Sequence, residues 1–140
     1  MAKDFFVEVL SSNKSLYQGK SSEVVLPAYD GEVGVLADHG DFIGLLGTGA
    51  LKIVTSGNDY WFMLSKGVYH IENGKLIILA EKGDASSAVD ISLVNSRIPE
   101  LEEKFKDLNV FSTPEYKNLK LEYDQLKAKQ EVYKRTNVVN

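Results

Sequence analysis

His39 is the residue of this chain best placed to do chemistry, because it stands between two aspartates in a short polar stretch. Residues 26–40 read LPAYDGEVGVLADHG, so Asp38 precedes His39, and Asp41 follows shortly after. An imidazole and two carboxylates are ligands that metal ions accept. Neighbouring loop residues seldom converge on one ion without further ligands, so we expect a loop that another protein contacts and no metal site.

Other catalytic constellations lack the residues that they need. The sequence has no cysteine, so it offers no thiolate nucleophile, disulfide or cysteine-based zinc site. A catalytic triad would have to use His39 or His70, and His70 alternates with apolar neighbours, which predicts the outward face of a strand. The glycine spacing in 44–51 imitates a phosphate-binding P-loop, but Ala50 and Leu51 replace its lysine and its serine or threonine, so we expect a turn. No pair among the 20 acidic residues stands out as the two carboxylates of a glycosidase, so elimination indicates a binding or coupling protein.

Composition indicates one folded domain with at most a small appendage. A length of 140 residues is enough to bury a core, and 44% hydrophobic with 26% charged residues is typical of a globular protein. A net charge of −4 argues against a nucleic-acid-binding protein, which usually carries a basic face. The N-terminus shows no export signal, and apolar runs such as Leu76 to Ala80 are far shorter than the roughly 20 residues of a bilayer span. Any membrane association should therefore go through a partner.

The first part of the chain has the pattern of β-strands. From Asp4 to about Ala80, short or alternating apolar runs are separated by turn residues, which predicts a sandwich of about eight to ten strands. Asn73-Gly74 predicts a tight hairpin between strands at 68–72 and 75–80. The continuous apolar run at 60–64 predicts a strand that is covered on both faces.

The second part, after Glu81, has the pattern of two helices. Apolar residues recur at alternating spacings of three and four, first at Ile91, Val94, Ile98, Leu101, Phe105 and Leu108. The spacing restarts, with one polar member, at Tyr116, Leu119, Tyr123, Leu126, Gln130 and Tyr133. A connection of about five residues predicts antiparallel neighbours whose stripes pack on each other.

The ends of these helices are less well defined by the sequence. Pro99 lies inside the first stripe, where it removes one hydrogen bond, so the first helix either kinks there or begins near Ser96. Thr113, Pro114 and Glu115 have the order of an N-cap, a first-turn proline and a first-turn acid, which predicts the start of the second helix.

Two segments carry a resemblance to a known family. They are LPAYDGEVGVLADHGDFIGLLGTGALKIV, residues 26–54, and YWFMLSKGVYHIENGKLIILAE, residues 60–81. Residues 30–36 keep the order acid, Gly, Glu, apolar, Gly, apolar, apolar; His39 follows after two residues, and Gly49 closes the stretch. This order resembles the epsilon subunit of bacterial and chloroplast F-type ATP synthases. The resemblance implies a ten-stranded β-sandwich at 1–84, an antiparallel two-helix hairpin at 85–140, and a non-catalytic subunit of the rotating central stalk.

The same resemblance assigns two partners to the sandwich. In the family, the turn that matches Asp30, Gly31 and Glu32 lies against the polar loops of the membrane c-ring. Acids at a turn tip can meet basic loops in charge-assisted contacts, which fix register more than they add affinity.

The gamma subunit is the second implied partner. In the family, the histidine that matches His39 faces gamma, and Asp41 and Phe42 beside it are assigned to the same interface. This chain departs from the family at 37–38 and 40–41, where Ala-Asp and Gly-Asp replace the usual Pro-Gly and Ala-Pro. The extra acid changes the gamma contacts that the family pattern would give.

An ATP-sensing motif is present only in part. Bacterial relatives often carry an apolar residue and Asp, two further residues, and then Arg-Ala at the start of the first helix. Here Val89 and Asp90 keep the first two positions, whereas Leu93 and Val94 replace Arg-Ala. The fork that would hold a phosphate is therefore missing, although Arg97 lies one turn further on. We expect no cofactor, with Asp90 and Arg97 left open as an ATP-sensing pair.

The second helix carries a basic stripe, at Lys117, Lys120, Lys127, Lys134 and Arg135. Its simplest interpretation is a solvated helix face, with Lys120 near Glu102 of the first helix. The resemblance implies another role, in which the released tail meets acidic lobes of the catalytic alpha and beta subunits and inhibits ATP hydrolysis.

The resemblance also implies a place in the cell and a process: proton-driven ATP synthesis, in a peripheral position at the cytoplasmic face of the bacterial inner membrane. Two other classes stay open on the residues alone. A stand-alone β-sandwich adaptor with a coiled-coil tail would have the same periodicities, whereas a small hydrolase would need a convergent acid or histidine pair.

Overall fold

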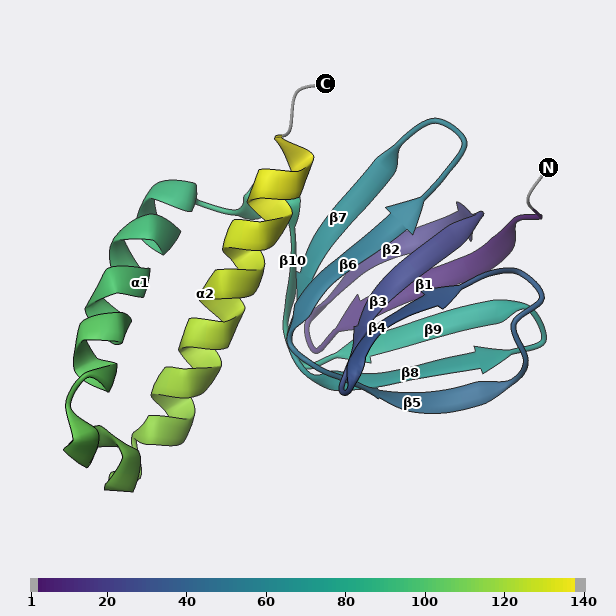
Figure 1. Ribbon diagram of the computed structural model, residues 1–140. Coiled ribbons are helices and arrows are strands. Elements are labelled where there is room, and N and C mark those ends of the chain that lie inside the picture. Colours follow the sequence, from purple (N-terminus) through teal and green to yellow (C-terminus); the bar gives the residue numbers. More distant parts are fainter. Residues whose placement is uncertain (1–2, 138–140) are drawn as a thin grey trace.

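The protein is a β-sandwich with two long helices at one side (Figure 1), and the computed structural model describes residues 3–137. The strands are β1 (Phe5–Ser11), β2 (Lys14–Ser21), β3 (Glu23–Ala28), β4 (Gly31–Val35), β5 (Phe42–Leu46), β6 (Gly49–Val54), β7 (Asp59–Leu64), β8 (Gly67–Glu72), β9 (Lys75–Ala80) and β10 (Gly83–Ala85). The helical elements are η1 (Ser86–Ala88), α1 (Ile91–Phe105), η2 (Leu108–Ser112) and α2 (Tyr116–Thr136). The predicted fold class, a ten-stranded sandwich followed by a helical hairpin, is confirmed. Residues 1–2 and 138–140, the outer ends of the two predicted domains, lie outside the described residues.

The strands form one sheet that folds over on itself. Their order is β10-β7-β6-β3-β5-β8-β9-β1-β2, and β4 pairs with β3 off this path. The pairing of β1 with β9 is parallel, and the other pairings are antiparallel. A single pair, Ala28 with Leu46, joins β3 to β5. The sheet divides at this weak junction into two layers, with β3, β4, β6, β7 and β10 in one and β5, β8, β9, β1 and β2 in the other.

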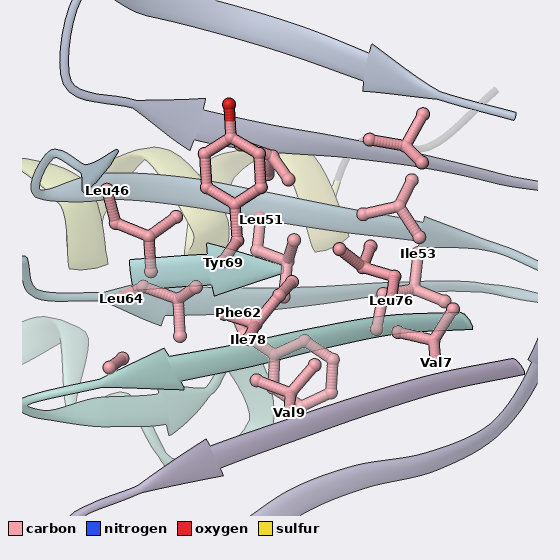
Figure 2. Close-up of a cluster of buried hydrophobic side chains, with 14 of the residues drawn as sticks. Val7, Val9, Leu46, Leu51, Ile53, Phe62, Leu64, Tyr69, Leu76 and Ile78 are labelled. Atoms are coloured by element: carbon pink, nitrogen blue, oxygen red, sulfur yellow. The ribbon is translucent and has the colours of Figure 1, made fainter. Parts of the chain in front are cut away.

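The core lies between the two layers and uses the alternating positions that the sequence predicts. Phe5, Val7 and Val9 of β1 are all buried, which confirms their predicted common face. Figure 2 shows side chains from both layers gathered in one cluster: Val7, Val9, Leu46, Leu51, Ile53, Phe62, Leu64, Tyr69, Leu76 and Ile78. Burying one such aliphatic side chain contributes about 1.5–3 kcal/mol. The sandwich therefore has a core of its own, without help from the helices.

The predicted hairpin at Asn73-Gly74 is confirmed. β8 pairs with β9 from Gly67 opposite Ala80 to Glu72 opposite Lys75. Asn73 has φ 52° and Gly74 has φ 74°, the left-handed conformations that a tight hairpin turn of this kind requires. His70 lies on the outer face of β8, as predicted, because its neighbours in the strand both point into the core.

Two expectations about strands are wrong in part. The run at 60–64 is covered on both faces only in its second half, since Tyr60 is 41% exposed at the edge of the inner face, where its ring lies 5.7 Å from the Tyr17 ring. The P-loop-like segment is not one turn, because Gly44 lies inside β5 and the chain turns only at Gly47 and Thr48. A side chain at Gly44 would meet the ring of Tyr69, which explains the glycine without any phosphate.

Helix α1 begins at Ile91, so the alternative start near Ser96 is wrong. Asp90 is its N-cap, and the Asp90 carboxylate accepts a hydrogen bond from the Leu93 N–H at 3.3 Å. The helix continues through Pro99, although proline has no backbone N–H and one hydrogen bond of the helix is therefore missing. Its buried residues, Val94, Ile98 and Leu101, are members of the predicted stripe. The stripe stops at Phe105 with the helix, and the side chain of Leu108 lies outside the described part of the chain.

Helix α2 begins at Tyr116, later than predicted. Thr113 is not its N-cap, because the Thr113 hydroxyl donates to the Val110 carbonyl at 2.7 Å and so ends η2 instead. η2 also makes the connection longer than the expected five or so residues. The two helices are antiparallel neighbours, as predicted (Figure 1).

Candidate functional site

The acidic turn lies at the tip of the β3–β4 hairpin. Ala28 pairs with Gly31, so Tyr29 and Asp30 form the turn itself. Gly31 has φ 134°, which side chains rarely adopt, so glycine is required there. Asp30 and Glu32 are exposed, and the Tyr29 side chain is 77% exposed. The hairpin therefore presents two carboxylates and an aromatic ring to a partner.

His39 lies in the connection that leaves the other end of β4. It is half-buried, and so less exposed than we expect of a residue in a loop that another protein contacts. Its Nδ1 is 2.7 Å from the Gly40 carbonyl oxygen, and its backbone N–H donates to the Leu36 carbonyl at 3.0 Å. The acidic turn and His39 are therefore at opposite ends of β4, so one flat partner surface would not easily cover both.

Asp41 and Phe42 both have contacts inside the sandwich. The Asp41 carboxylate accepts a hydrogen bond from the Asn73 N–H at 3.2 Å and so supports the β8–β9 turn. The Phe42 ring lies 5.9 Å from the Tyr69 ring, between centroids, and is half-exposed at the rim. Asp41 therefore has a structural reason to be present, whereas Phe42 still offers surface to a partner.

The outer face of β5, β8 and β9 carries, next to His70, an apolar surface that the sequence analysis missed. Ile43 and Leu45 of β5 are 69% and 60% exposed. Register places Leu45 beside Val68, and Val68 beside Leu79, in one row across the three strands. Figure 1 shows these strands turned away from both helices. We call this surface, defined by Ile43, Leu45, Val68 and Leu79, the open face. Its signal was the run Phe42–Leu46, in which neither face of the strand carries a polar residue.

The outer face of β6 and β7, on the other layer, is covered by the chain itself. Met63 of β7 is buried against Ala128 and Val132 of α2, with Ala50 and Trp61 beside it. Figure 1 shows α2 between α1 and these strands. We call this the covered face. Ala128 and Val132 are not in the predicted stripe of α2, because that stripe faces α1 and this one faces the sandwich.

Polar contacts border the covered face. The Gln125 amide donates to the Ser65 hydroxyl at 3.3 Å, and the Lys129 Nζ lies 3.8 Å from the Asp84 carboxylate. At the far end, the Arg135 guanidinium lies 5.9 Å from the centre of the Trp61 ring. These polar contacts are few, so α2 is held on the sandwich mainly by its apolar packing on β6 and β7.

The end of α2 also comes close to the acidic turn. Glu32, Trp61, Glu131 and Arg135 line one surface hollow. The Arg135 Nε donates to the Glu131 carboxylate at 2.7 Å, and this bond raises the pKa of Arg135, to which the charge of Glu32 adds. The acidic turn and the tail therefore meet in the folded chain, which no sequence pattern indicated.

The basic stripe of α2 is only partly free. Lys117, Lys127 and Lys134 are exposed, whereas the Lys120 Nζ lies 2.6 Å from the Asp124 carboxylate in the same helix. That hydrogen bond raises the pKa of Lys120. The predicted partner of Lys120 is wrong, because Glu102 accepts a hydrogen bond from the Tyr123 hydroxyl at 3.0 Å instead.

The two residues left open as an ATP-sensing pair both have protein partners. Asp90 caps α1, and the guanidinium of Arg97 bonds to Glu122 of α2 and to Glu100. Both line a hollow of about 500 Å³ between η1, α1 and α2. Within residues 3–137, no three His, Asp or Glu side chains are grouped to hold a metal ion, and no helix is long and apolar enough to cross a bilayer.

Comparisons with known proteins agree on one family. The family model of the beta-sandwich domain of the ATP synthase delta/epsilon chain matches residues 4–84. The ATP synthase epsilon chain of Sulfurimonas denitrificans is 36% identical over 109 residues, which cover 74% of this chain and 82% of that relative. The epsilon chain of Prochlorococcus marinus is 30% identical over 122 residues, covering 78% and 91%.

A solved structure has the same fold. One chain in the cryo-EM structure of the Euglena gracilis mitochondrial ATP synthase, which holds OSCP, F1 and the c-ring, superposes with a TM-score of 0.67 at 18% identity. The superposition covers 95% of this chain and 79% of that one. With residues 4–84 matching the family model and more than a third of the aligned residues identical to a bacterial relative, the chain belongs to the family of ATP synthase epsilon chains.

Proposed function

We propose that the chain is a non-catalytic rotor subunit of an F-type ATP synthase, which couples the catalytic head to the membrane c-ring in proton-driven ATP synthesis. Membership of the epsilon chain family supports this proposal. The observation that carries it is the open face, because an outer sheet face with exposed Ile43 and Leu45 needs a partner to cover it.

The gamma subunit is the proposed occupant of the open face. Covering apolar surface stabilises a complex by roughly 25 cal/mol per Å² before the costs of association. Phe42 is the first residue of β5, the strand that carries Ile43 and Leu45, and His39 lies in the loop leading to it, so both are placed beside the same interface. Ile43, Leu45, Val68 and Leu79 are its proposed centre, with His39, Asp41 and Phe42 at its margin.

The c-ring is the proposed partner of Asp30, Gly31 and Glu32. Tyr29, Leu45 and Val68 line a hollow that connects this turn to the open face. One side of the sandwich can thus bind gamma while the adjoining turn contacts basic loops of the ring. These contacts would hold the chain peripherally at the cytoplasmic face of a bacterial inner membrane.

The helical hairpin is proposed to inhibit ATP hydrolysis when it leaves the sandwich. In α2, Ala128 and Val132 are the fully buried residues of the contact with the sandwich, so a few side chains hold the docked tail and a released state can be populated when a partner binds it. A released α2 would offer Lys117, Lys127 and Lys134 to acidic surfaces of the catalytic alpha and beta subunits.

Leu45→Asp tests the proposed function. Because Leu45 is 60% exposed, the substitution should leave the isolated chain folded but place a charge in the gamma interface. We expect co-purification with the gamma subunit to be lost. Leu93→Asp is the matched control, since Leu93 is 67% exposed on α1 and away from the open face. Equal gamma binding by both variants would contradict the open face as the gamma interface, and no gamma binding by the unsubstituted chain would favour the stand-alone adaptor.

A further inference from the structure

An ion-pair network lines one wall of the hollow between η1, α1 and α2. The Arg97 Nε and Nη2 donate to the two carboxylate oxygens of Glu122, at 2.9 and 3.1 Å. Its Nη1 donates to the Glu100 carboxylate at 2.9 Å. Every nitrogen of the guanidinium therefore has a carboxylate partner, and the two-pronged contact with Glu122 joins α1 to α2.

This contact differs from the other polar links between the two helices. Tyr123 donates to Glu102 through one hydroxyl, and Gln130 donates to Asn95 through one amide, each at 3.0 Å. The Arg97–Glu122 contact has two parallel bonds and two full charges, a geometry about twice as strong as a neutral pair. The Arg97 side chain is 33% and the Glu122 side chain 40% exposed, so water screens this pair, although less than it screens a fully exposed pair such as Glu103 with Lys106.

The charges around the hollow are unfavourable to a phosphate. Three carboxylates, those of Asp90, Glu100 and Glu122, line it together with two cations, Arg97 and Lys129. Lys129 is directed to Asp84 of the sandwich, and Arg97 is fully engaged. The Arg97 guanidinium also holds the pKa of Glu122 below its ordinary value, through the hydrogen bonds first, so this carboxylate stays ionised at neutral pH. A nucleotide would have to displace a carboxylate from Arg97 before it could bind.

We propose that Arg97 and Glu122 form a clasp that, together with the apolar stripe, holds the helical hairpin closed without a nucleotide, so that closure of this tail depends on protein charges and ionic strength and not on ATP. Arg97 is the arginine nearest to the incomplete ATP-sensing motif, and in this structure it joins the two helices through Glu122. Its consequence for inhibition of hydrolysis rests on the proposed function, but the clasp itself does not.

Hydrogen exchange of the full-length isolated chain tests the clasp. Arg97→Gln, Glu122→Gln and the double variant are compared with Lys120→Gln, which breaks an ion pair inside α2 and leaves the clasp intact. Each single clasp variant should speed exchange in α1 and α2 by about threefold to tenfold, and the double variant should be no worse than either single one. Amides of β1 and β9 serve as the internal control for folding. Additive effects of the two substitutions, or effects no larger than that of Lys120→Gln, would overturn the clasp.

Salt and nucleotide give two further readouts on the same samples. Raising sodium chloride from about 0.05 M to about 0.5 M should speed exchange in the wild-type helices but not in the double variant. Millimolar MgATP should leave the wild-type exchange unchanged. Saturable protection of α1 and α2 by MgATP would show a nucleotide site and refute the proposal. No assembled ATP synthase is used. The result therefore does not depend on whether the tail inhibits ATP hydrolysis.

Discussion

The two outer faces of the sandwich are built alike, yet only one of them is covered by its own chain. On the covered face, Met63 is buried by α2, and small residues, Ala50 and Ala128, let the helix approach the sheet. On the open face, Ile43 and Leu45 are largely exposed although they are just as apolar. An apolar outer strand face therefore indicates a partner in both cases: a helix of the same chain for one and, we infer, another subunit for the other.

An aspartate placed on each face in turn should affect the isolated chain very differently, and the covered face should show the largest effect. Met63→Asp should detach α2, because a docked helix would bury an unpaired carboxylate at a cost of about 3 kcal/mol. Val68→Asp should change the thermal stability by less than about 0.5 kcal/mol, since Val68 is already partly exposed.

Trp61 makes this comparison measurable. It is the one tryptophan of the sequence and lies under the end of α2, so its fluorescence should shift to the red when the helix leaves. A red shift is expected for Met63→Asp and not for Val68→Asp. Identical spectra for the two variants would show that the faces do not differ as described.

A smaller effect is expected when the covering element is removed altogether. Deleting 111–140 should raise ATP hydrolysis by the assembled complex severalfold, because a released tail could no longer stop rotation. Assembly should survive, since the open face and the sandwich core lie outside the deleted segment. Hydrolysis that is unchanged at both low and high ATP would assign the tail a purely structural role.

Local patterns predicted the elements whose structure depends on near neighbours. Alternation at Val7 and Val9 identified a core strand, and Asn73-Gly74 identified a hairpin, because strand period and turn conformation are decided within a few residues. Thr113 misled the prediction for a related reason: a hydroxyl near a helix start can equally end the preceding turn, and here it bonds back to Val110.

Features that join distant segments were not predictable from periodicity. Val132 lies on a second apolar face of α2 that is visible only once Met63 is known to lie beneath it. Arg97 meets Glu122 across the hairpin, a pairing that depends on the register of two helices. The open face was missed because a continuous apolar strand does not say whether its cover belongs to the same chain.

If the open face is the gamma interface, gamma should slow hydrogen exchange there and leave the covered face unchanged. The full-length chain is exchanged alone and with purified gamma subunit. We predict slower exchange in β5, β8 and β9, with β6, β7 and α2 unchanged. Protection confined to β6, β7 and α2, or no protection of β5 at saturating gamma, would show that gamma does not bind the open face.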